Sequence, residues 1–312
     1  MLAIFLKTVP FFALIGLGYG AGRTRFFTPE ATAWLTKFVF FFALSAMLFN
    51  FAANLTLAEI FDLRIVAAYL LGTTIVYLIA TAAGLFRGLS VSECAVESQC
   101  AVIGNVGFLG IPMFVLLLGP ASAGPMLMVL ATDLIVFSSL IVILITGSRE
   151  GRVSVRTLRT VGLGLATNPM IVSILAGIAW SATGRDLWTP VEEFVALLGA
   201  AATPGALFAI GASLAGKSAE RVSVAAWLSF CKLLLHPAAV ALAALVLLPV
   251  HDPFAATVMI SAAALPVAGN VYMLAQHYGV APQRVSAAIL VSTAVSVVTV
   301  STIIGLLTGG TP

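Results

Sequence analysis

The sequence predicts an all-α integral membrane protein whose ten transmembrane helices form two inverted five-helix repeats. Three observations support this fold class. The chain of 312 residues is 61% hydrophobic and only 9% charged, whereas soluble domains carry about 25% charged residues. Its apolar runs have the length of a membrane helix, about 20 residues, with short polar breaks between them. Similar motifs also recur in the same order in its two halves.

Ten apolar runs are the candidate helices. They lie near residues 3–22, 31–52, 64–86, 93–119, 123–147, 168–184, 190–215, 224–249, 254–278 and 284–308. No basic segment precedes the first run, so we expect a retained helix there instead of a cleaved signal peptide. The three cysteines all lie in apolar runs, which indicates buried, unpaired thiols.

Basic residues gather on the loops of one side of the predicted bundle. That side holds Arg23, Arg25, Arg87, Arg149, Arg152, Arg156, Arg159, Lys217, Arg221 and Arg284, whereas the other holds Arg64 and Arg185. The richer side is expected to be cytoplasmic, which places both termini outside the cytoplasm of an inner or plasma membrane. The basic loop 148–160 is interpreted as a linker between the halves 1–147 and 161–312.

The two halves repeat a series of short motifs. Their offset ranges from 159 residues, between Pro10 and Pro169, to 165 residues, between the GNV motifs at 104–106 and 269–271. Between these lie Gly22-Arg23 with Gly184-Arg185, Thr28-Pro29 with Thr189-Pro190, and LAE at 57–59 with SAE at 218–220. Five helices per half is an odd number, so the second half inserts upside down, as in many secondary transporters.

The fourth and ninth runs carry helix breakers near their middle. Pro112 and Pro266 are expected to interrupt these helices, because proline lacks a backbone donor and clashes with the preceding turn. The N-terminal ends of half-helices carry partial positive charge, which suits an anion. Packing of small residues is the alternative explanation for both motifs. The predicted substrate site comprises Asn105, Asn270, Gly104, Gly107, Pro112, Pro266 and Gly269.

Two ionisable residues lie deep within the predicted spans. Asp133 is about 15 Å along its helix at 1.5 Å per residue, close to the midplane. It can carry a coupling proton, bind a cation or serve as a structural carboxylate, and these alternatives remain open. Lys232 can attract an anion, but we favour structural pairing or a side chain that snorkels to the cytoplasmic interface.

The remaining polar residues indicate no catalysis. His236, His277, Lys37 and Glu97 are interpreted as structural. No arrangement resembles a catalytic triad, a zinc motif or a phosphate-binding loop. We therefore expect no enzymatic activity, no bound metal or cofactor and no nucleic-acid partner.

Several longer motifs, "GNVGFLGIPM", "ATPGALFAIGASLAG", "CKLLLHP" and "ALPVAGNVYMLAQHYGV", resemble the auxin efflux carrier family. This resemblance covers essentially the whole chain, and the family includes plant auxin exporters and bacterial malonate carriers. It implies a fold similar to bile acid–sodium symporters, with spans 1, 2, 6 and 7 as a scaffold and spans 3–5 and 8–10 as an elevator-like transport domain. It also implies a substrate site near Asn105. Ser45 replaces a proline common in the family's second span, so a straighter helix is expected there, while Pro204 is kept in the seventh.

The expected function is secondary active transport of a small organic anion, either a mono- or a dicarboxylate of the auxin or malonate type. A sodium-coupled symporter of the bile acid type is the alternative, although the sequence supplies few acidic cation ligands near the broken helices. A non-transporting sensor or a channel fits the inverted repeat less well. The coupling ion, H+ or Na+, is left open. Membrane lipid is an expected partner, and a homodimer through the scaffold helices is a further expectation.

Overall fold

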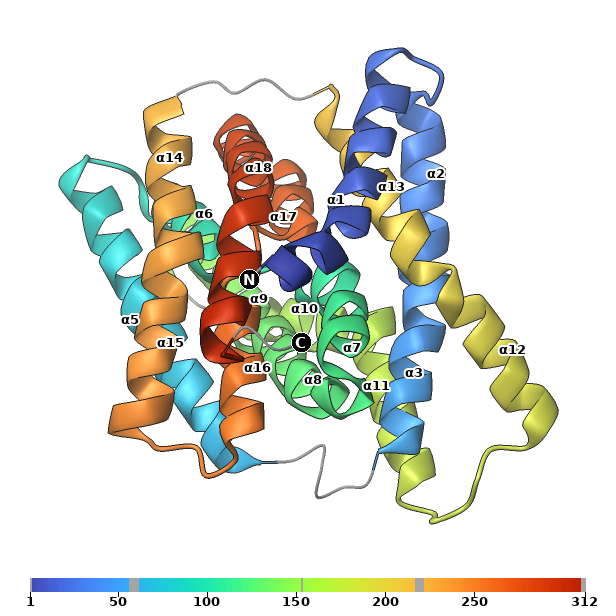
Figure 1. The fold of residues 1–312 in the computed structure, drawn as a ribbon. Coiled ribbons are helices and arrows are strands. Elements are labelled where there is room, and N and C mark those ends of the chain that lie inside the picture. The colour runs from blue at the N-terminus through green and yellow to red at the C-terminus, as the bar shows by residue number, and fades with distance from the viewer. Residues whose placement is uncertain (1, 56–61, 153, 217–221, 310–312) are drawn as a thin grey trace.

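The computed structural model describes residues 2–55, 62–152, 154–216 and 222–309 (Figure 1). Within these ranges almost every residue is helical, and the one β-type pairing is an isolated antiparallel bridge between Gly104 and Val267. The prediction of an all-α protein is confirmed. The repeat segments 57–59 and 218–220, together with Lys217 and Arg221, lie outside the described residues.

The first half of the chain contains the following elements. They are α1 (Leu2–Arg23), α2 (Pro29–Phe38), a π-turn (Val39–Ala43), α3 (Leu44–Asn54), α5 (Leu63–Phe86), α6 (Val91–Val102), a π-turn (Val106–Gly110), α7 (Ile111–Leu118), a 3-10 turn (Pro120–Ser122), α8 (Ala123–Thr132), a π-turn (Asp133–Phe137) and α9 (Ser138–Glu150).

The second half contains a further series of helices and π-turns. It contains α10 (Val155–Ala166), α11 (Pro169–Ser181), α12 (Thr189–Ala200), α13 (Ala202–Leu214), α14 (Val222–Phe230), a π-turn (Cys231–Leu235), α15 (His236–Leu242), a π-turn (Ala243–Leu247), α16 (Pro253–Ala263), α17 (Gly269–Tyr278) and α18 (Pro282–Leu307).

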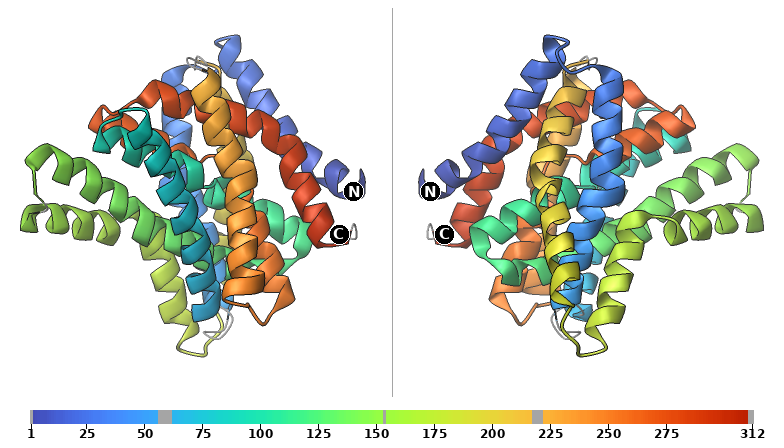
Figure 2. Two further views of the ribbon diagram at one scale, coloured as in Figure 1. Left: turned by 90° about the vertical axis from the view of Figure 1, so that its left-hand side faces the viewer. Right: turned by 90° about the vertical axis from the view of Figure 1, so that its right-hand side faces the viewer.

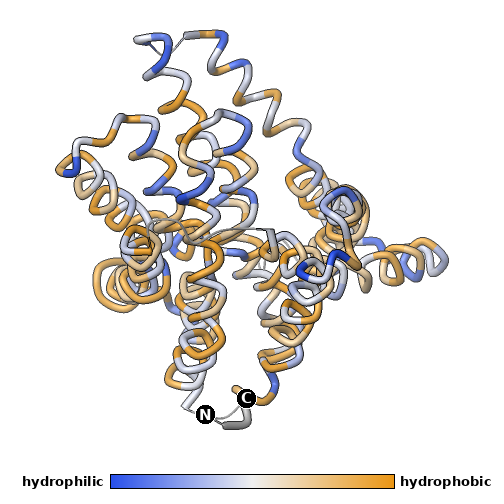
Figure 3. The backbone as a smooth tube through the Cα atoms, turned by 90° about the horizontal axis from the view of Figure 1, so that it is seen from above, coloured by the Kyte–Doolittle hydropathy of each residue, from blue (hydrophilic) through white to orange (hydrophobic). Residues whose placement is uncertain are grey.

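Seven described helices are long and apolar enough to cross a membrane, or eight when the bent pair α10 and α11 counts as one span. This count is lower than the ten predicted runs because the fourth and ninth runs are each divided. Their pieces Val106–Leu118 and Pro253–Ala263 are apolar but shorter than a full span. Apolar residues predominate along the helices, and hydrophilic residues concentrate toward their ends and loops (Figure 3).

The helices pack in two groups (Figure 1). In one group α1 lies along α13, and α3 lies along α11 and α12. In the other group α5 packs on α6 and α15, while α14 packs on α18. Glycines permit the closest approach in the first group, because a Cβ atom at Gly18 or Gly211 would overlap the backbone of the facing helix.

The second predicted span forms one helical segment from Pro29 to Asn54. A π-turn lies within it, and the Ser45 hydroxyl donates to the Phe40 carbonyl at 3.1 Å. The seventh span also counts as one segment, although a single turn residue, Ala201, separates α12 from α13 three residues before Pro204. The presence or absence of proline therefore changes these two spans only locally.

The basic segment 148–160 differs from the loop expected from its charges. Helix α9 continues to Glu150, and α10 begins at Val155 after a reciprocal capping box between Ser154 and Thr157. Gly151 ends α9 in the left-handed conformation, with φ of 69°, which favours glycine. The two helices form a hairpin that projects from the bundle (Figure 2).

Candidate functional site

The first broken helix is interrupted between α6 and α7. Ile103 is extended, with φ −82° and ψ 112°, and Asn105 has φ −76° and ψ 56°. A π-turn then begins at Val106, and the Asn105 carbonyl accepts from the N–H groups of Leu109 and Gly110 at 3.2 and 2.9 Å. The break therefore lies at residues 103–105.

The prediction that Pro112 interrupts this helix is wrong. Pro112 is the second residue of α7, which continues directly from the π-turn Val106–Gly110. The π-turn before it is wider than an α-helical turn, which gives room for the proline ring. Pro112 lies seven positions after Asn105, inside the continuous helical piece Val106–Leu118, so it does not cause the break.

The second broken helix is interrupted between α16 and α17. Helix α16 ends at Ala263, and residues 264–268 are non-helical. Pro266 lies within this break, as predicted. Gly269 and Asn270 form the first turn of α17, where the leading N–H groups have no partner inside the helix.

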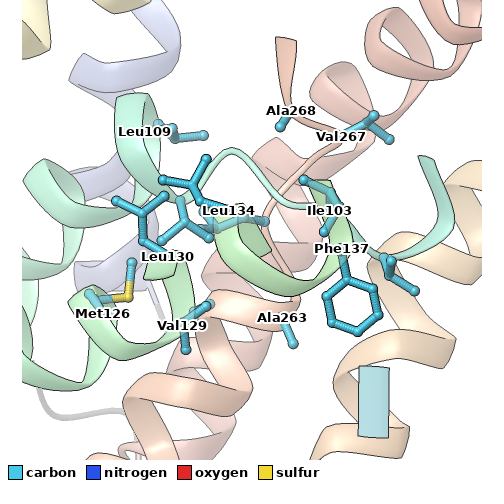
Figure 4. Close-up of a cluster of buried hydrophobic side chains, with 14 of the residues drawn as sticks. Ile103, Leu109, Met126, Val129, Leu130, Leu134, Phe137, Ala263, Val267 and Ala268 are labelled. Carbon is cyan, nitrogen blue, oxygen red and sulfur yellow. The ribbon is translucent and has the colours of Figure 1, made fainter. Parts of the chain in front are cut away.

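The two breaks cross and bond to each other through their main chains. The Asn105 N–H donates to the Pro266 carbonyl at 2.8 Å, and the Ala268 N–H donates to the Ile103 carbonyl at 3.1 Å. These bonds satisfy backbone groups that a membrane interior would leave without partners. Buried side chains surround the crossing, including Ile103, Leu130, Leu134, Phe137 and Val267 (Figure 4).

A cavity of about 530 Å³ lies beside the crossing. Five predicted site residues line it: Gly104, Asn105, Gly107, Gly269 and Asn270. The other four, Pro112, Pro266, Asp133 and Lys232, are not among its lining residues. The structure thus brings both GNV motifs to one cavity and separates them from the two buried ionisable groups.

The two asparagine side chains differ in their surroundings. Asn105 is only 5% exposed, and its side chain makes no hydrogen bond with any described residue. The Oδ1 atom of Asn270 is buried and has no partner in the described part of the chain. Buried polar atoms nearly always have hydrogen-bond partners. The unpartnered Oδ1 atom of Asn270, beside Asn105 in the wall of the same cavity, therefore indicates a place for a polar ligand group.

Lys232 points into the protein, so of the two alternatives favoured from the sequence the structure supports structural pairing and not snorkelling. Its side chain is fully buried, and Nζ lies 2.5 Å from the Ala263 carbonyl oxygen and 3.1 Å from His236 Nδ1. His236 Nε2 in turn lies 3.0 Å from Thr73 Oγ1. Because Ala263 is the last residue of α16, the ammonium is held at the edge of the second break.

Asp133 is also buried, with 2% of its surface exposed. Tyr69 donates its hydroxyl proton to Asp133 Oδ1 at 2.9 Å, whereas Oδ2 has no hydrogen-bond partner among the described residues. The Tyr69 ring lies 5.8 Å from the His236 ring, centroid to centroid. Asp133, Lys232 and His236 thus belong to one buried polar cluster behind the crossing.

Glu97, interpreted from the sequence as structural, lies in a buried network of ion pairs. It is 1% exposed and forms ion pairs with Arg87 and with Arg284, the latter at 3.0 Å. Arg284 also pairs with Glu93 at 3.0 Å. These contacts tie the beginning of α6 to α5 and α18, away from the cavity.

Sequence reasoning missed several cavity residues. His277, treated as structural, lines the cavity together with Asn168 and the hydroxyl residues Ser138 and Ser139. His277 follows Asn270 by seven residues, which is two helical turns and places both on one face of α17. That spacing is a signal in the sequence. Ser138 and Ser139 carry no comparable signal, because their approach depends on how the helices pack.

The cavity wall combines apolar surface with neutral polar groups. No Asp, Glu, Lys or Arg occurs among its lining residues in the described chain. Phe40 and Phe108 lie in its wall with stacked rings, 6.5 Å apart between centroids. The site can therefore bind one polar head through amide and N–H donors and cover an apolar body with aromatic and aliphatic side chains.

Comparison with known proteins adds independent information. A family model described as "Membrane transport protein" matches residues 3–304. A Rhizobium meliloti (strain 1021) protein named as a malonate transporter is 30% identical over 308 residues, covering 97% of this chain and 95% of the relative.

Proposed function

We propose that this chain, which belongs to the auxin efflux carrier family of membrane transport proteins, is a secondary active carrier of an organic carboxylate. The crossing of the two broken helices beside a cavity lined by Asn105 and Asn270 carries this proposal. A carboxylate at this position meets amide donors and the N-terminal end of α17 together.

The cavity lining favours a monocarboxylate with an apolar body over a dicarboxylate. A second carboxylate would need its own compensating charge or donors, and the lining offers no cationic side chain. The cavity volume of about 530 Å³ also exceeds what a three-carbon diacid fills. The relative's name makes malonate the reference compound to test against.

Transport into proteoliposomes tests the proposal. Radiolabelled indole-3-acetate, benzoate and malonate are offered to purified protein, with pH and sodium gradients imposed separately. We expect uptake of an apolar monocarboxylate at lower concentration than malonate. Preferred uptake of malonate would reject the substrate class and retain the carrier. No uptake of any carboxylate, together with no ligand-dependent rise in melting temperature, would reject the carrier itself.

Proton coupling is favoured over sodium coupling by the buried polar cluster. The Lys232 ammonium lies at the second break, uses the Ala263 carbonyl oxygen and repels other cations. A carboxyl, an imidazole and an ammonium in one cluster can instead exchange a proton. A sodium-coupled symporter stays the alternative, and the sodium gradient in the same liposomes tests it.

Asp133→Asn is expected to remove the pH dependence of transport while leaving substrate binding in place. Asparagine keeps the volume of the side chain and can still accept from the Tyr69 hydroxyl. The measurement is the initial uptake rate between pH 5 and 8, with Thr302→Val on the exposed face of α18 as the control variant. A parental pH profile in Asp133→Asn would leave this carboxylate a purely structural role.

The two groups of helices support an elevator-like movement. The first group corresponds to predicted spans 1, 2, 6 and 7, and the second contains both broken helices. We propose that ten inverted spans place both termini outside the cytoplasm and residues 148–160 inside. A single cysteine at Ser154, in a chain lacking Cys94, Cys100 and Cys231, is expected to resist an impermeant thiol reagent in intact cells. Labelling there from outside would reverse the orientation.

A further inference from the structure

Asn168 lies at the bend between α10 and α11 and lines the cavity. Its side chain caps α11, because Oδ1 accepts from the N–H groups of Met170 at 2.9 Å and Ile171 at 3.4 Å. Backbone N–H groups donate only to the oxygen of a side-chain amide, so these two contacts determine which atom is Oδ1. The polar group that remains is Nδ2, which has two N–H donors.

The Nδ2 group of Asn168 has no use within the described chain. It donates to none of the described residues, although the side chain is partly buried. Both acceptor positions of Oδ1 are already occupied by the end of α11. Asn168 therefore offers donors to the cavity, and donors suit an acceptor group such as a carboxylate.

A second observation indicates that a ligand group belongs in this part of the cavity. Asn105 is 5% exposed, lines the same cavity and makes no side-chain hydrogen bond with any described residue. The first turn of α11 lies against its motif, since a Cβ atom at Gly107 would be 2.8 Å from Met170 Cε. Asn105 and Asn168 are each two residues from this contact, which places both amides in the same part of the cavity.

The two amides belong to different groups of helices. Asn168 begins α11, which packs along α3 in the first group. Asn105 lies in the break between α6 and α7, and Asn270 lies in α17, both in the second group. A ligand bound by all three amides contacts both groups at once.

We propose that Asn168 is a third donor to the substrate carboxylate, and that its Nδ2 group binds the substrate from the first group of helices while Asn105 and Asn270 bind it from the second. This inference rests on the proposed function and adds a specificity-determining residue to the same cavity. Variants of Asn168 that keep the helix cap separate the role in binding from the role in folding.

The first test uses Asn168→Ser, because serine is a good N-cap residue but lacks the amide donors. Affinities for indole-3-acetate, benzoate and malonate are measured by calorimetry on the full-length protein, with melting temperatures alongside. We expect a loss of affinity of about tenfold or more for the carboxylate that the parental protein binds, with a parental melting temperature. Asn168→Asp also keeps the cap and is expected to lose more, because its carboxylate repels the ligand.

The control variant is Asp252→Ser, which exchanges one capping residue for another outside the cavity. Asp252 is exposed and caps α16 through the Phe254 N–H at 2.9 Å. Its variant is expected to keep the parental affinity. Parental affinity in Asn168→Ser would overturn the proposal and leave Asn168 a helix cap. Weak binding by Asn168→Asp alone would not rescue it, because an added charge also acts at a distance.

The second test compares each acid with its amide, namely indole-3-acetamide, benzamide and malonamide. Asn168→Ser is expected to lower affinity for the acid by a larger factor than for the amide, since charge-assisted hydrogen bonds are about twice as strong as neutral ones. Equal factors would indicate a general change in the cavity and would overturn the assignment. A parental protein that binds no carboxylate would reject the proposed function and this inference together, whereas parental carboxylate binding by Asn168→Ser would reject only the role of Asn168.

Discussion

In the first broken helix the residues Gly104 and Asn105 form the break, whereas in the second the matching Gly269 and Asn270 begin a new helix. The second break precedes its motif and contains Pro266. Consequently Gly104 pairs with Val267, two residues before its counterpart in the sequence repeat. The two GNV motifs thus lie at equivalent places in the two halves, but their backbones have different conformations.

The helices that lead into the two breaks also differ. Helix α6 buries Glu97, Ser98 and Gln99, whereas α16 is almost entirely apolar. Lys232 reaches the second break from α14 and the π-turn that follows it, and its ammonium also lies against Gly104. The buried charged groups are therefore distributed unequally between the two broken helices.

The largest expected effect follows from removing the cation between the two breaks. Lys232→Met leaves the Ala263 carbonyl and His236 Nδ1 without their partner. Hydrogen bonds to charged groups contribute about 1.5–3 kcal/mol each, so we expect a loss of about 3 kcal/mol in the free energy of unfolding. Thermal unfolding in detergent measures it, with the exposed Lys37→Met as control. An unchanged melting temperature in Lys232→Met would contradict a structural role at the crossing.

The asparagines allow a direct comparison of the two motifs. Asn105→Ala is expected to weaken carboxylate binding by one to two powers of ten, because a charge-assisted hydrogen bond contributes about 1.5–3 kcal/mol. Asn270→Ala is expected to weaken it less, since its motif lies in a helical turn whose N–H groups remain available. Calorimetry gives the affinities, and melting temperatures verify folding.

The control for the asparagine pair is Asn50→Ala, outside the cavity. Its affinity is expected to match that of the parental protein. Parental affinity in both Asn105→Ala and Asn270→Ala would remove the crossing from consideration as the binding site and return both motifs to helix packing.

The smallest expected effect distinguishes the two glycines. A Cβ atom at Gly104 would lie 3.2 Å from Lys232 Nζ and 3.4 Å from the Ala262 carbonyl oxygen, whereas at Gly269 it would meet no atom within 4 Å. Gly104→Ala is expected to destabilise the protein by about 1 kcal/mol. Gly269→Ala is expected to be neutral or to stabilise it by less than about 1 kcal/mol. Equal changes in melting temperature would mean that the two breaks are packed alike.

Most helices could be predicted from the sequence because apolar runs of membrane length are a strong signal. The existence of two breaks also followed from glycine and proline in long apolar runs. The location of the first break did not, because the π-turn Val106–Gly110 accommodates Pro112 inside the helical piece Val106–Leu118. The helix at 155–166 was missed because its arginines dominated the interpretation, although its capping box and amphipathic period were present.

The direction of single side chains was the least predictable feature. A lysine eight residues into a membrane helix can reach an interface or point inward, and the rotation of the helix decides between them. For Lys232 that rotation is set by packing against α6 and α18, which the local sequence does not encode. The cavity asparagines were predictable because the GNV motif occurs twice.

The bonds that join the two breaks belong to the main chain, and this has a consequence for divergence among related carriers. The donors are the N–H groups of Asn105 and Ala268, and the acceptors are the carbonyls of Pro266 and Ile103. None of these bonds requires a particular side chain at the four positions, apart from excluding proline at the two donors. Neighbouring cavity residues are therefore free to change over evolutionary time and to admit new substrates while the crossing itself persists.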